Sequence, residues 1–163
     1  MTAQEGIVIV DVPTDRRESL EGILAESFEG WYLMHSRRTL QHIEQVRAAM
    51  SIDKPIGLTM LKIVERTIGY VYYIAVARSE RKKGIGKLLL EDALYIFKAK
   101  GLHEAFASIE HDNSASEALF ASKGFAQTSF IEVSKKYGNL HTVNMYRVMR
   151  VVPGEVLLRK LIL

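Results

Sequence analysis

The chain has 163 residues, of which 48% are hydrophobic and 25% charged, and we expect residues 1–163 to form a single globular domain. Its net charge is only +3, which argues against a broad nucleic-acid-binding surface. It has no cysteine, which excludes disulfides and thiolate metal sites and fits a reducing, cytoplasmic setting. The five histidines lack metal-ligand spacing, and no apolar run approaches the length of a membrane span, so we expect neither a metal nor a membrane partner.

The N-terminal residues predict a strand followed by a helix. Residues 5–12 are rich in Ile and Val and end at Pro13, as is typical of a short strand. Asp15 and Glu18 then have the spacing of a capping box, which predicts a helix whose apolar stripe reaches Phe28.

Residues 30–34 hold the single tryptophan of the chain, Trp31, among other aromatic and apolar residues. We interpret this segment as a loop packed on the core, with the wall of a binding site as the alternative. A second helix is expected from Ser36 to Gln45, with Leu40 and Ile43 facing inward.

Three strands are predicted next. Residues 46–52 and 55–64 are two β-branched arms joined by a turn at residues 53–54. A second turn at residues 66–67 leads into a third strand at residues 69–77, which is rich in aromatic and β-branched residues.

A basic turn containing two glycines follows this third strand. Residues 78–87 carry five basic residues and one acidic residue, a net charge of +4, so the rest of the chain has a net charge of −1. An apolar stripe at helical spacing then runs from Ile85 to Phe97, and Gly101 stands where a C-cap is expected. Because the first turn of a helix leaves backbone N–H groups unpaired, this arrangement predicts an anion site. The residue pattern does not fit a P-loop or a dinucleotide-binding fingerprint and reads R-x-x-G-x-G. The alternative to an anion site is a solvated basic turn that only caps the helix.

The second half predicts a strand at residues 104–110 and a short helix after it. Ser114 and Glu117 have capping-box spacing. The helical residues expected to face inward are Ala115, Ala118 and Leu119.

Two further strands are expected at residues 125–133 and 141–152, separated by a polar loop at residues 134–139. Residues 155–163 are too apolar to extend freely into water. We expect them to pack on their own domain or across a homodimer interface.

Two motifs at a fixed separation connect these elements. The strand residues 73–76 and the R-x-x-G-x-G turn at residues 81–86 are followed, about thirty residues later, by Asn113 and the segment Leu119-Phe120-x-x-Lys123-Gly124-Phe125. Over about residues 55–150 this combination resembles the GNAT superfamily of N-acetyltransferases. The resemblance implies an α/β (α+β) fold with a mixed, mostly antiparallel sheet of about seven strands and helices on both faces. In that fold the fourth and fifth strands splay apart to admit the pantetheine arm of acetyl-CoA.

The resemblance also implies which residues bind acetyl-CoA as a co-substrate. The backbone of Ile74 and Val76 would pair with the pantetheine amides, and N–H groups of the glycine turn would hold the pyrophosphate. Asn113 would contact the cofactor arm, and the alternative for this residue is a plain helix N-cap. The complete set of expected cofactor-binding residues is Ile74, Ala75, Val76, Arg81, Lys82, Lys83, Gly84, Ile85, Gly86, Lys87, Asn113 and Phe120.

The implied chemistry is direct attack of a neutral primary amine on the thioester in a ternary complex. The sequence departs from the family pattern at Phe120, where many members have a tyrosine that protonates the leaving sulfur. It departs again in the strand before the glycine turn, which has tyrosines where some members have a glutamate base. The catalytic candidates are therefore Glu110, His111 and Tyr72, for which solvated strand ends and a plain strand residue are the alternatives.

The leading interpretation is thus an acetyl-CoA-dependent N-acetyltransferase whose partner is a small-molecule or peptide amine and not a nucleic acid. The acceptor is expected to enter beside residues 31–35 and 134–139. Peptide N-termini, lysines, polyamines, aminoglycosides and small metabolites all remain open as acceptors. A non-catalytic acyl-CoA-binding or sensor domain, suggested by Phe120, is the alternative function. A nucleic-acid-binding module built on residues 78–87 is the weakest alternative because that turn lacks interleaved aromatic residues.

Overall fold

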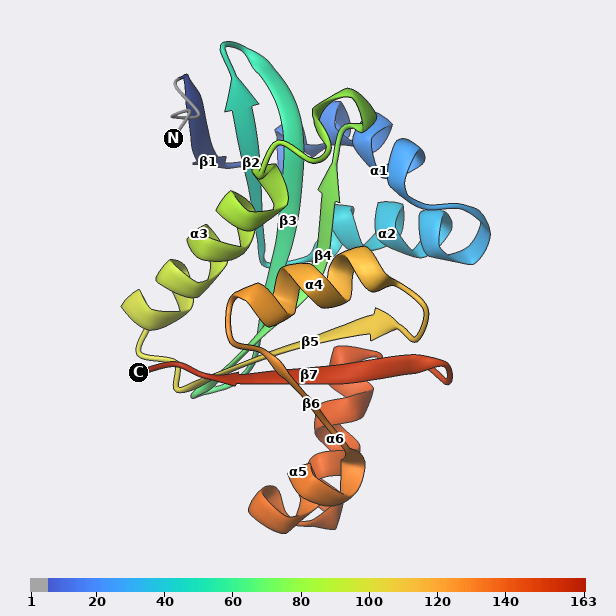
Figure 1. The fold of residues 1–163 in the computed structure, drawn as a ribbon, viewed down its shortest axis with the longest axis vertical. Helices are drawn as coiled ribbons and strands as arrows, with labels where there is room; N and C mark the ends of the chain where they lie inside the picture. The colour runs from blue at the N-terminus through green and yellow to red at the C-terminus, as the bar shows by residue number, and fades with distance from the viewer. Residues whose placement is uncertain (1–5) are drawn as a thin grey trace. The chain divides into compact units, whose positions relative to one another are not determined.

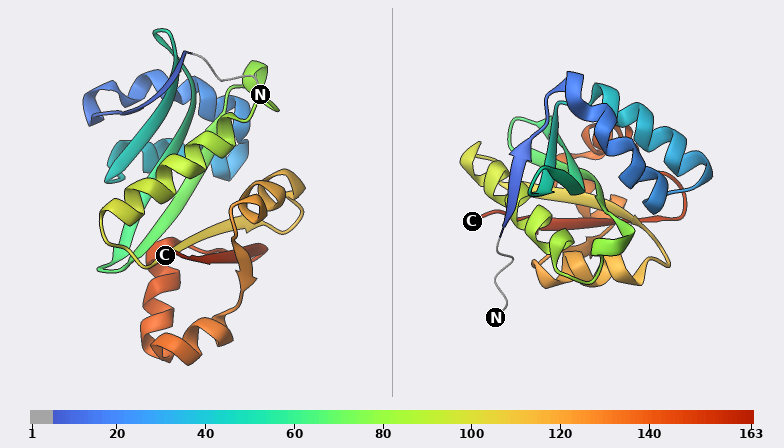
Figure 2. Two further views of the ribbon diagram at one scale, coloured as in Figure 1. Left: turned by 60° about the vertical axis from the view of Figure 1, so that its left-hand side comes forward. Right: turned by 90° about the horizontal axis from the view of Figure 1, so that it is seen from above.

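The computed structural model of the protein describes residues 6–163 (Figures 1 and 2). The strands are β1 (Ile7–Asp11), β2 (Gln45–Ser51), β3 (Lys54–Glu65), β4 (Ile68–Val76), β5 (Glu104–Glu110), β6 (Ala126–Thr128) and β7 (Glu155–Leu161). The helices are α1 (Glu21–Ser27), α2 (Gly30–His42), α3 (Ile85–Ala99), α4 (Ser114–Ser122), α5 (Phe130–Tyr137) and α6 (Asn139–Met149), with 3-10 turns η1 (Thr14–Leu20) and η2 (Arg78–Glu80).

The seven strands within residues 6–163 form one mixed sheet in the order β1-β2-β3-β4-β5-β7-β6. β4 and β5 are parallel, whereas β1 with β2, β2 with β3, β5 with β7 and β6 with β7 are antiparallel. This topology confirms the expected mixed, mostly antiparallel sheet of about seven strands.

The chain divides into two compact units, of which the first contains the residues up to Lys62 together with Tyr73–Ala93. Within it, α1 and α2 lie on one face of the β1–β3 strands and the first turns of α3 lie on the other (Figure 2). Ile85 and Leu89 of α3 are buried against the sheet. A Cβ on Gly57 of β3 would lie 3.1 Å from both side chains, so the small residue there lets α3 approach closely.

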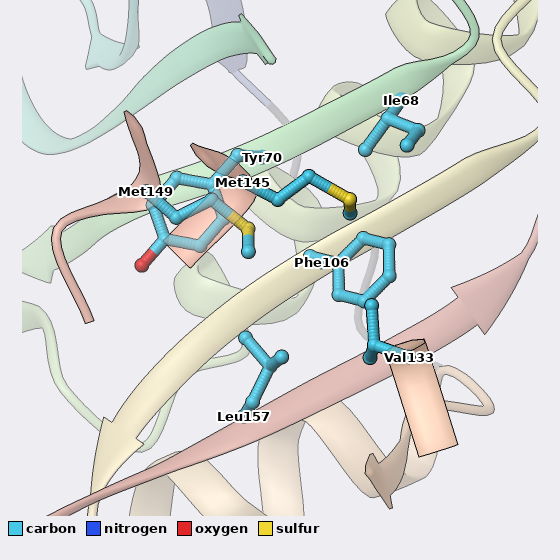
Figure 3. Close-up of a cluster of buried hydrophobic side chains, with 7 residues drawn as sticks. All are labelled: Ile68, Tyr70, Phe106, Val133, Met145, Met149 and Leu157. Atoms are coloured by element: carbon cyan, nitrogen blue, oxygen red, sulfur yellow. The ribbon is translucent and has the colours of Figure 1, made fainter. Parts of the chain in front are cut away.

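The second unit contains Ile63–Tyr72 and Leu94–Leu163. Within it, α4 lies on one face of β5 and β7, and the α5–α6 hairpin lies on the other (Figure 1). The core between the strands and this hairpin is built from Ile68, Tyr70, Phe106, Val133, Met145, Met149 and Leu157 (Figure 3). Three of these seven side chains come from the hairpin, so α5 and α6 are part of the hydrophobic core of this unit.

The segment after β1 is helical as expected, but it begins as a 3-10 turn and Asp15 does not cap it. Pro13 occupies the N-cap position in an extended conformation without a side-chain cap bond. The side chain of Arg17 is buried and donates to the carbonyl oxygens of Val12, Leu40 and Ile43. The bonds to Leu40 and Ile43 tie η1 to the C-terminal end of α2, and the bond to Val12 ties it to the segment after β1. The predicted strand at residues 5–12 is confirmed as β1, although Glu5 lies outside the described residues.

The interpretation of residues 30–34 as a core-packed loop is wrong. These residues form the first turn of α2, which begins six residues before the predicted helix. Leu40 and Ile43 are buried as predicted, whereas Trp31 is 48% exposed because it lies off the buried stripe of the helix.

The strands predicted at residues 125–133 and 141–152, and the loop predicted between them, are also wrong. The chain forms only the three-residue β6 and then the α5–α6 hairpin. The Ser129 hydroxyl accepts from the backbone N–H of Glu132 and so caps α5. This Ser-x-x-Glu spacing predicts a helix start, but the β-branched residues around it favoured a strand. Three residues at helical spacing are buried in α6, namely Thr142, Met145 and Met149.

The predicted cap and inward face of α4 need correction as well. Asn113, and not Ser114, is the N-cap. Ala115 and Ala118 are exposed, and the inward positions belong to Leu119 and Phe120.

The C-terminal residues form β7, which pairs with both β5 and β6. Leu157 and Leu158 are buried in their own unit, whereas Leu161 and Leu163 are exposed. Packing in their own unit, the first of the two arrangements expected, therefore accounts for part of their apolar character, and the homodimer stays a prediction.

Candidate functional site

Within residues 6–163, the glycine turn leaves the first backbone N–H groups of α3 without an acceptor in the helix. Lys82 and Gly84 have left-handed backbone conformations, with φ of 62° and 82°. The N–H of Leu88 donates to the carbonyl of Gly84 at 3.1 Å, which makes Gly84 the N-cap residue. The N–H groups of the residues in between have no acceptor within the helix and point out of its N-terminus, where the helix dipole favours an anion. The turn therefore has the geometry of the anion site that its sequence predicts.

Arg81 fixes this turn to its own unit. Its Nε donates to the carbonyl of Val76 at 3.1 Å, and its Nη2 donates to the carbonyl of Glu26 at 2.8 Å. Lys83 pairs with Glu80 at 3.1 Å. Arg81 thus positions the backbone donors of the turn, and its contact with the cofactor stays a prediction.

The C-terminal half of β4 presents a second recognition element, an edge of backbone groups. The pairing of β4 with β5 covers only Ile68–Val71. Ala77 donates to the carbonyl of Ile56 in β3, and the carbonyl of Tyr73 accepts from Thr59 at 3.0 Å, so odd-numbered residues in this stretch turn their backbone toward β3.

Because the backbone direction alternates along a strand, Ile74 and Val76 turn their N–H and C=O groups to the opposite edge. In the described residues that edge has no strand paired with it beyond Val71. Ile74 and Val76 therefore both face this edge, where the Val76 carbonyl accepts from Arg81, and their contacts with the pantetheine amides stay predictions. Ala75 lies between them with its carbonyl oxygen beside Gly57 of β3, so its backbone faces the other way.

An aromatic cluster that sequence analysis did not predict lies beside this strand in the same unit. The Tyr73 hydroxyl and His35 Nδ1 are 2.7 Å apart. Trp31 stacks on the His35 ring with centroids 4.8 Å apart and planes 9° apart, and Phe28 meets the Tyr73 ring edge-on at 5.1 Å. The sequence held one signal for this cluster. Side chains alternate along a strand, so Tyr73 had to point to the opposite face of the sheet from its neighbour Tyr72.

In the second unit, the structure shows Asn113 as a helix cap. Its side-chain oxygen accepts from the N–H of Ser116 at 3.1 Å. That bond leaves the Asn113 amide nitrogen and the second lone pair of its oxygen for a contact with the cofactor. Phe120 is buried and meets Phe125 edge-on at 5.1 Å, as expected for an apolar wall. The cofactor contacts of both residues stay predictions.

The three catalytic candidates differ sharply in their surroundings. Glu110 ends β5 opposite Glu155, and it is exposed. The His111 side chain is 78% exposed and pairs with Asp112 at 2.9 Å. Burial raises the pKa of Tyr72 to about 12, so its phenol stays protonated at neutral pH and is suited to donating a proton and not to accepting one. These contacts do not gather the three candidates around one point.

A buried carboxylate in the second unit was also missed. Glu104 is almost fully buried, and it accepts from Arg159 at 2.5 Å and from Lys136 and Tyr137. Burial alone would raise its pKa, but these hydrogen bonds outweigh that effect and lower the pKa of Glu104 overall. Tyr137, which was expected to lie beside the amine substrate, belongs to this cluster. Its pKa is raised, mainly by burial and next by its hydrogen bond to Glu104. We interpret the cluster as a structural one, in which hydrogen bonds to Glu104 connect α5 and β7 to β5.

Within residues 6–163, no three potential metal-ligating side chains lie together, and no helix has the length and apolar character needed to cross a membrane.

Comparison with known proteins matches this geometry to one family. The sequence model described as the acetyltransferase (GNAT) family matches residues 16–125, more than half of the chain. A mycothiol acetyltransferase from Renibacterium salmoninarum is 34% identical over 62 residues, which cover 38% of this chain and only 18% of that relative.

Two solved structures show the same fold. An acetyltransferase from Streptococcus agalactiae has a TM-score of 0.73 and 13% identity, with 96% of this chain and 99% of that chain covered. The PaiA N-acetyltransferase from Thermoplasma acidophilum, solved in complex with coenzyme A, has a TM-score of 0.71 and 18% identity, with 95% and 98% covered.

Proposed function

The chain belongs to the GNAT family of acetyltransferases, and on that premise we propose that it transfers an acetyl group from acetyl-CoA to a primary amine by direct attack in a ternary complex. The two units would act together as one acetyltransferase domain. The acceptor would be a small molecule or a peptide amine.

The observation that carries this proposal is the combination of two backbone elements in one unit. The open edge of β4 offers the backbone N–H and C=O groups of Ile74 and the N–H group of Val76 to an extended, amide-containing ligand, while the Val76 carbonyl already accepts from Arg81. The first turn of α3 offers unpaired N–H groups to an anion. Coenzyme A matches both elements, because the amides of its pantetheine arm can pair with the strand edge and its pyrophosphate can accept from the N–H groups of the helix. The relative from Thermoplasma acidophilum, which was solved with coenzyme A, supports the same choice of ligand.

The chain's own residues then supply orientation and charge stabilisation. Pairing with Ile74 would hold the thioester end of acetyl-CoA at a fixed place on β4, and orientation alone accounts for a large part of catalysis in reactions of two bound substrates. Backbone N–H groups at this edge would stabilise the oxyanion that forms as the amine attacks the carbonyl carbon. The thiolate can leave without a strong proton donor, since a thiol has an ordinary pKa near 8.5.

The test is acetyl-CoA binding by calorimetry to the wild type and to Gly84→Glu. A side chain at Gly84 would occupy the approach of the pyrophosphate and add a negative charge. Each lost charge-assisted contact costs on the order of 1.5 to 3 kcal/mol, so the affinity should fall by at least tenfold. Gly138→Glu is the matched control because Gly138 has nearly the same φ, 84° against 82°, with no heavy atom near the added Cβ.

Equal binding by wild type and Gly84→Glu would reject the proposed cofactor site. Equal losses in Gly84→Glu and Gly138→Glu would mean that backbone strain, and not the site, explains the effect. Tight binding without acetyl-CoA-dependent thiol release across a broad amine panel would favour the acyl-CoA sensor instead of the transferase.

A further inference from the structure

The aromatic cluster beside β4 contains a pair of facing titratable groups, Tyr73 and His35, next to the proposed thioester position. Tyr73 and His35 are 2.7 Å apart, and both side chains are partly exposed. Stacking on Trp31 fixes the plane of the imidazole, and the edge-on contact with Phe28 fixes the phenol. The pair is therefore held in one geometry by its neighbours.

Tyr73 stands directly before the residue that would bind the cofactor. Consecutive side chains of a strand point to opposite faces. Ile74 packs toward α3 with the cluster that contains Ile85 and Leu89. The Tyr73 side chain points to the opposite face, where it meets His35 of α2. An amine that approaches the thioester from the α2 face would meet the Tyr73 hydroxyl.

We propose that Tyr73 is the residue that takes the proton from the acceptor amine and that His35 positions it and takes its hydroxyl proton in turn. This inference rests on the proposed acetyl transfer. The amine enters after losing one proton to solvent and attacks the acetyl carbon. As the C–N bond forms, an N–H proton passes to the Tyr73 oxygen while the Tyr73 O–H proton passes to His35 Nδ1. The C–S bond then breaks, the thiolate gains a proton from solvent, and the imidazolium returns its proton to solvent.

The surroundings of the pair suit this relay better than those of the other candidates. Tyr72 is packed in the core of the second unit, and Glu110 and His111 lie at an exposed strand end. Charged side chains that flank the cluster in sequence include Glu26 at the end of α1, the exposed Glu29 at the N-cap of α2, and Arg38, one turn after His35 on α2. The titratable Tyr32 meets Trp31 edge-on at 5.0 Å. Glu26 accepts from the backbone N–H of Arg78 at 2.5 Å, and Arg38 is exposed. From β3 the neighbour of Tyr73 is the uncharged Thr59.

The experiment is the pH dependence of kcat/KM for a primary amine whose own pKa is above 9, with Tyr73→Phe and His35→Asn. Deprotonation of the amine alone makes the logarithm of the rate rise with a slope of one. An imidazole that must be neutral adds a second unit of slope below about pH 6.5, the ordinary range for histidine. We expect a slope near two in acid for the wild type and near one for both variants, with rates lowered about 10²- to 10⁴-fold. Tyr95→Phe removes a hydroxyl from an exposed tyrosine on α3 and should match the wild type.

A second measurement reports on the pair without turnover. The imidazole resonance of His35 is identified by its loss in His35→Asn, and its titration midpoint should shift in Tyr73→Phe and stay unchanged in Tyr95→Phe. Acetyl-CoA affinity should be unaffected in all three variants. A wild-type slope of one, or unchanged rates and slopes in Tyr73→Phe, would overturn this inference while leaving the proposed function intact. Absence of any turnover by the wild type would overturn the proposed function, and this inference with it.

Discussion

The buried carboxylate of Glu104 allows a stability change to be worked out from the structure. Glu104→Gln keeps the shape of the side chain but turns one of its two acceptor oxygens into a donor facing Arg159. Hydrogen bonds to a charged group are worth about 1.5 to 3 kcal/mol each, and breaking a buried ion pair costs about 3 to 5 kcal/mol. The side chains of Arg159 and Lys136 are 31% and 47% exposed, so both can turn to water and leave no buried cation. We therefore expect a loss of about 2 to 3 kcal/mol.

Thermal unfolding at pH 7 should show this loss as a fall in Tm of about 4 to 12 °C. The pKa of Glu104 is lowered by folding, so its contribution is complete above its ordinary pKa and is lost as the pH falls through the lower folded value. The difference in Tm between wild type and variant should therefore shrink below about pH 4. Glu18→Gln at an exposed position of η1 is the control and should stay within about 0.5 kcal/mol of the wild type. A difference that is absent at pH 7, or unchanged at pH 3, would refute the reasoning.

Two further predictions concern Phe120 and Gly69. Phe120→Tyr should leave the rate of acetyl transfer within about tenfold of the wild type, because a thiolate departs without strong acid assistance, and the pH profile of both proteins with one amine checks this. A rise of 10²-fold or more would show that a proton donor at this position matters. Gly69→Ala should destabilise by about 1 to 3 kcal/mol in urea unfolding, because its Cβ would lie 2.7 Å from the Phe97 ring. Gly22→Ala, whose Cβ would meet no neighbour, is the control, and equal midpoints for the two variants would contradict the prediction.

The sequence predicts best where a local signal and a tertiary contact agree. Residues 104–110 were predicted as the strand that the structure shows, and the glycine turn was predicted to precede a helix that ends before Gly101. In both places the apolar period, the terminating residues and the burial pattern point to one element. The proposed pyrophosphate site depends on this agreement, because its donors would belong to the backbone of a correctly predicted helix start.

Prediction failed where composition favoured one element and packing another. Residues 141–152 contain four Val, which favour a strand, yet Met145 and Met149 pack on the core of the second unit at helical spacing, so tertiary burial decides the structure. The Tyr73–His35 pair could not be predicted, because it depends on which face of β4 meets α2, and that placement follows from the three-dimensional packing and not from a local pattern.

Arg17 has a consequence for protein engineering. Its guanidinium donates to the carbonyls of Leu40 and Ile43 at the end of α2. In many helices the last carbonyl groups are instead satisfied by the last turn itself or by a C-cap residue. The end of α2 is thus secured from outside the helix. A combinatorial library that varies its exposed positions Met34, Arg37 and Arg38 can therefore change the chemistry of that surface while the helix terminus keeps its partner. Such a library would test the predicted entry of the acceptor beside residues 31–35, provided that Arg17 is held constant.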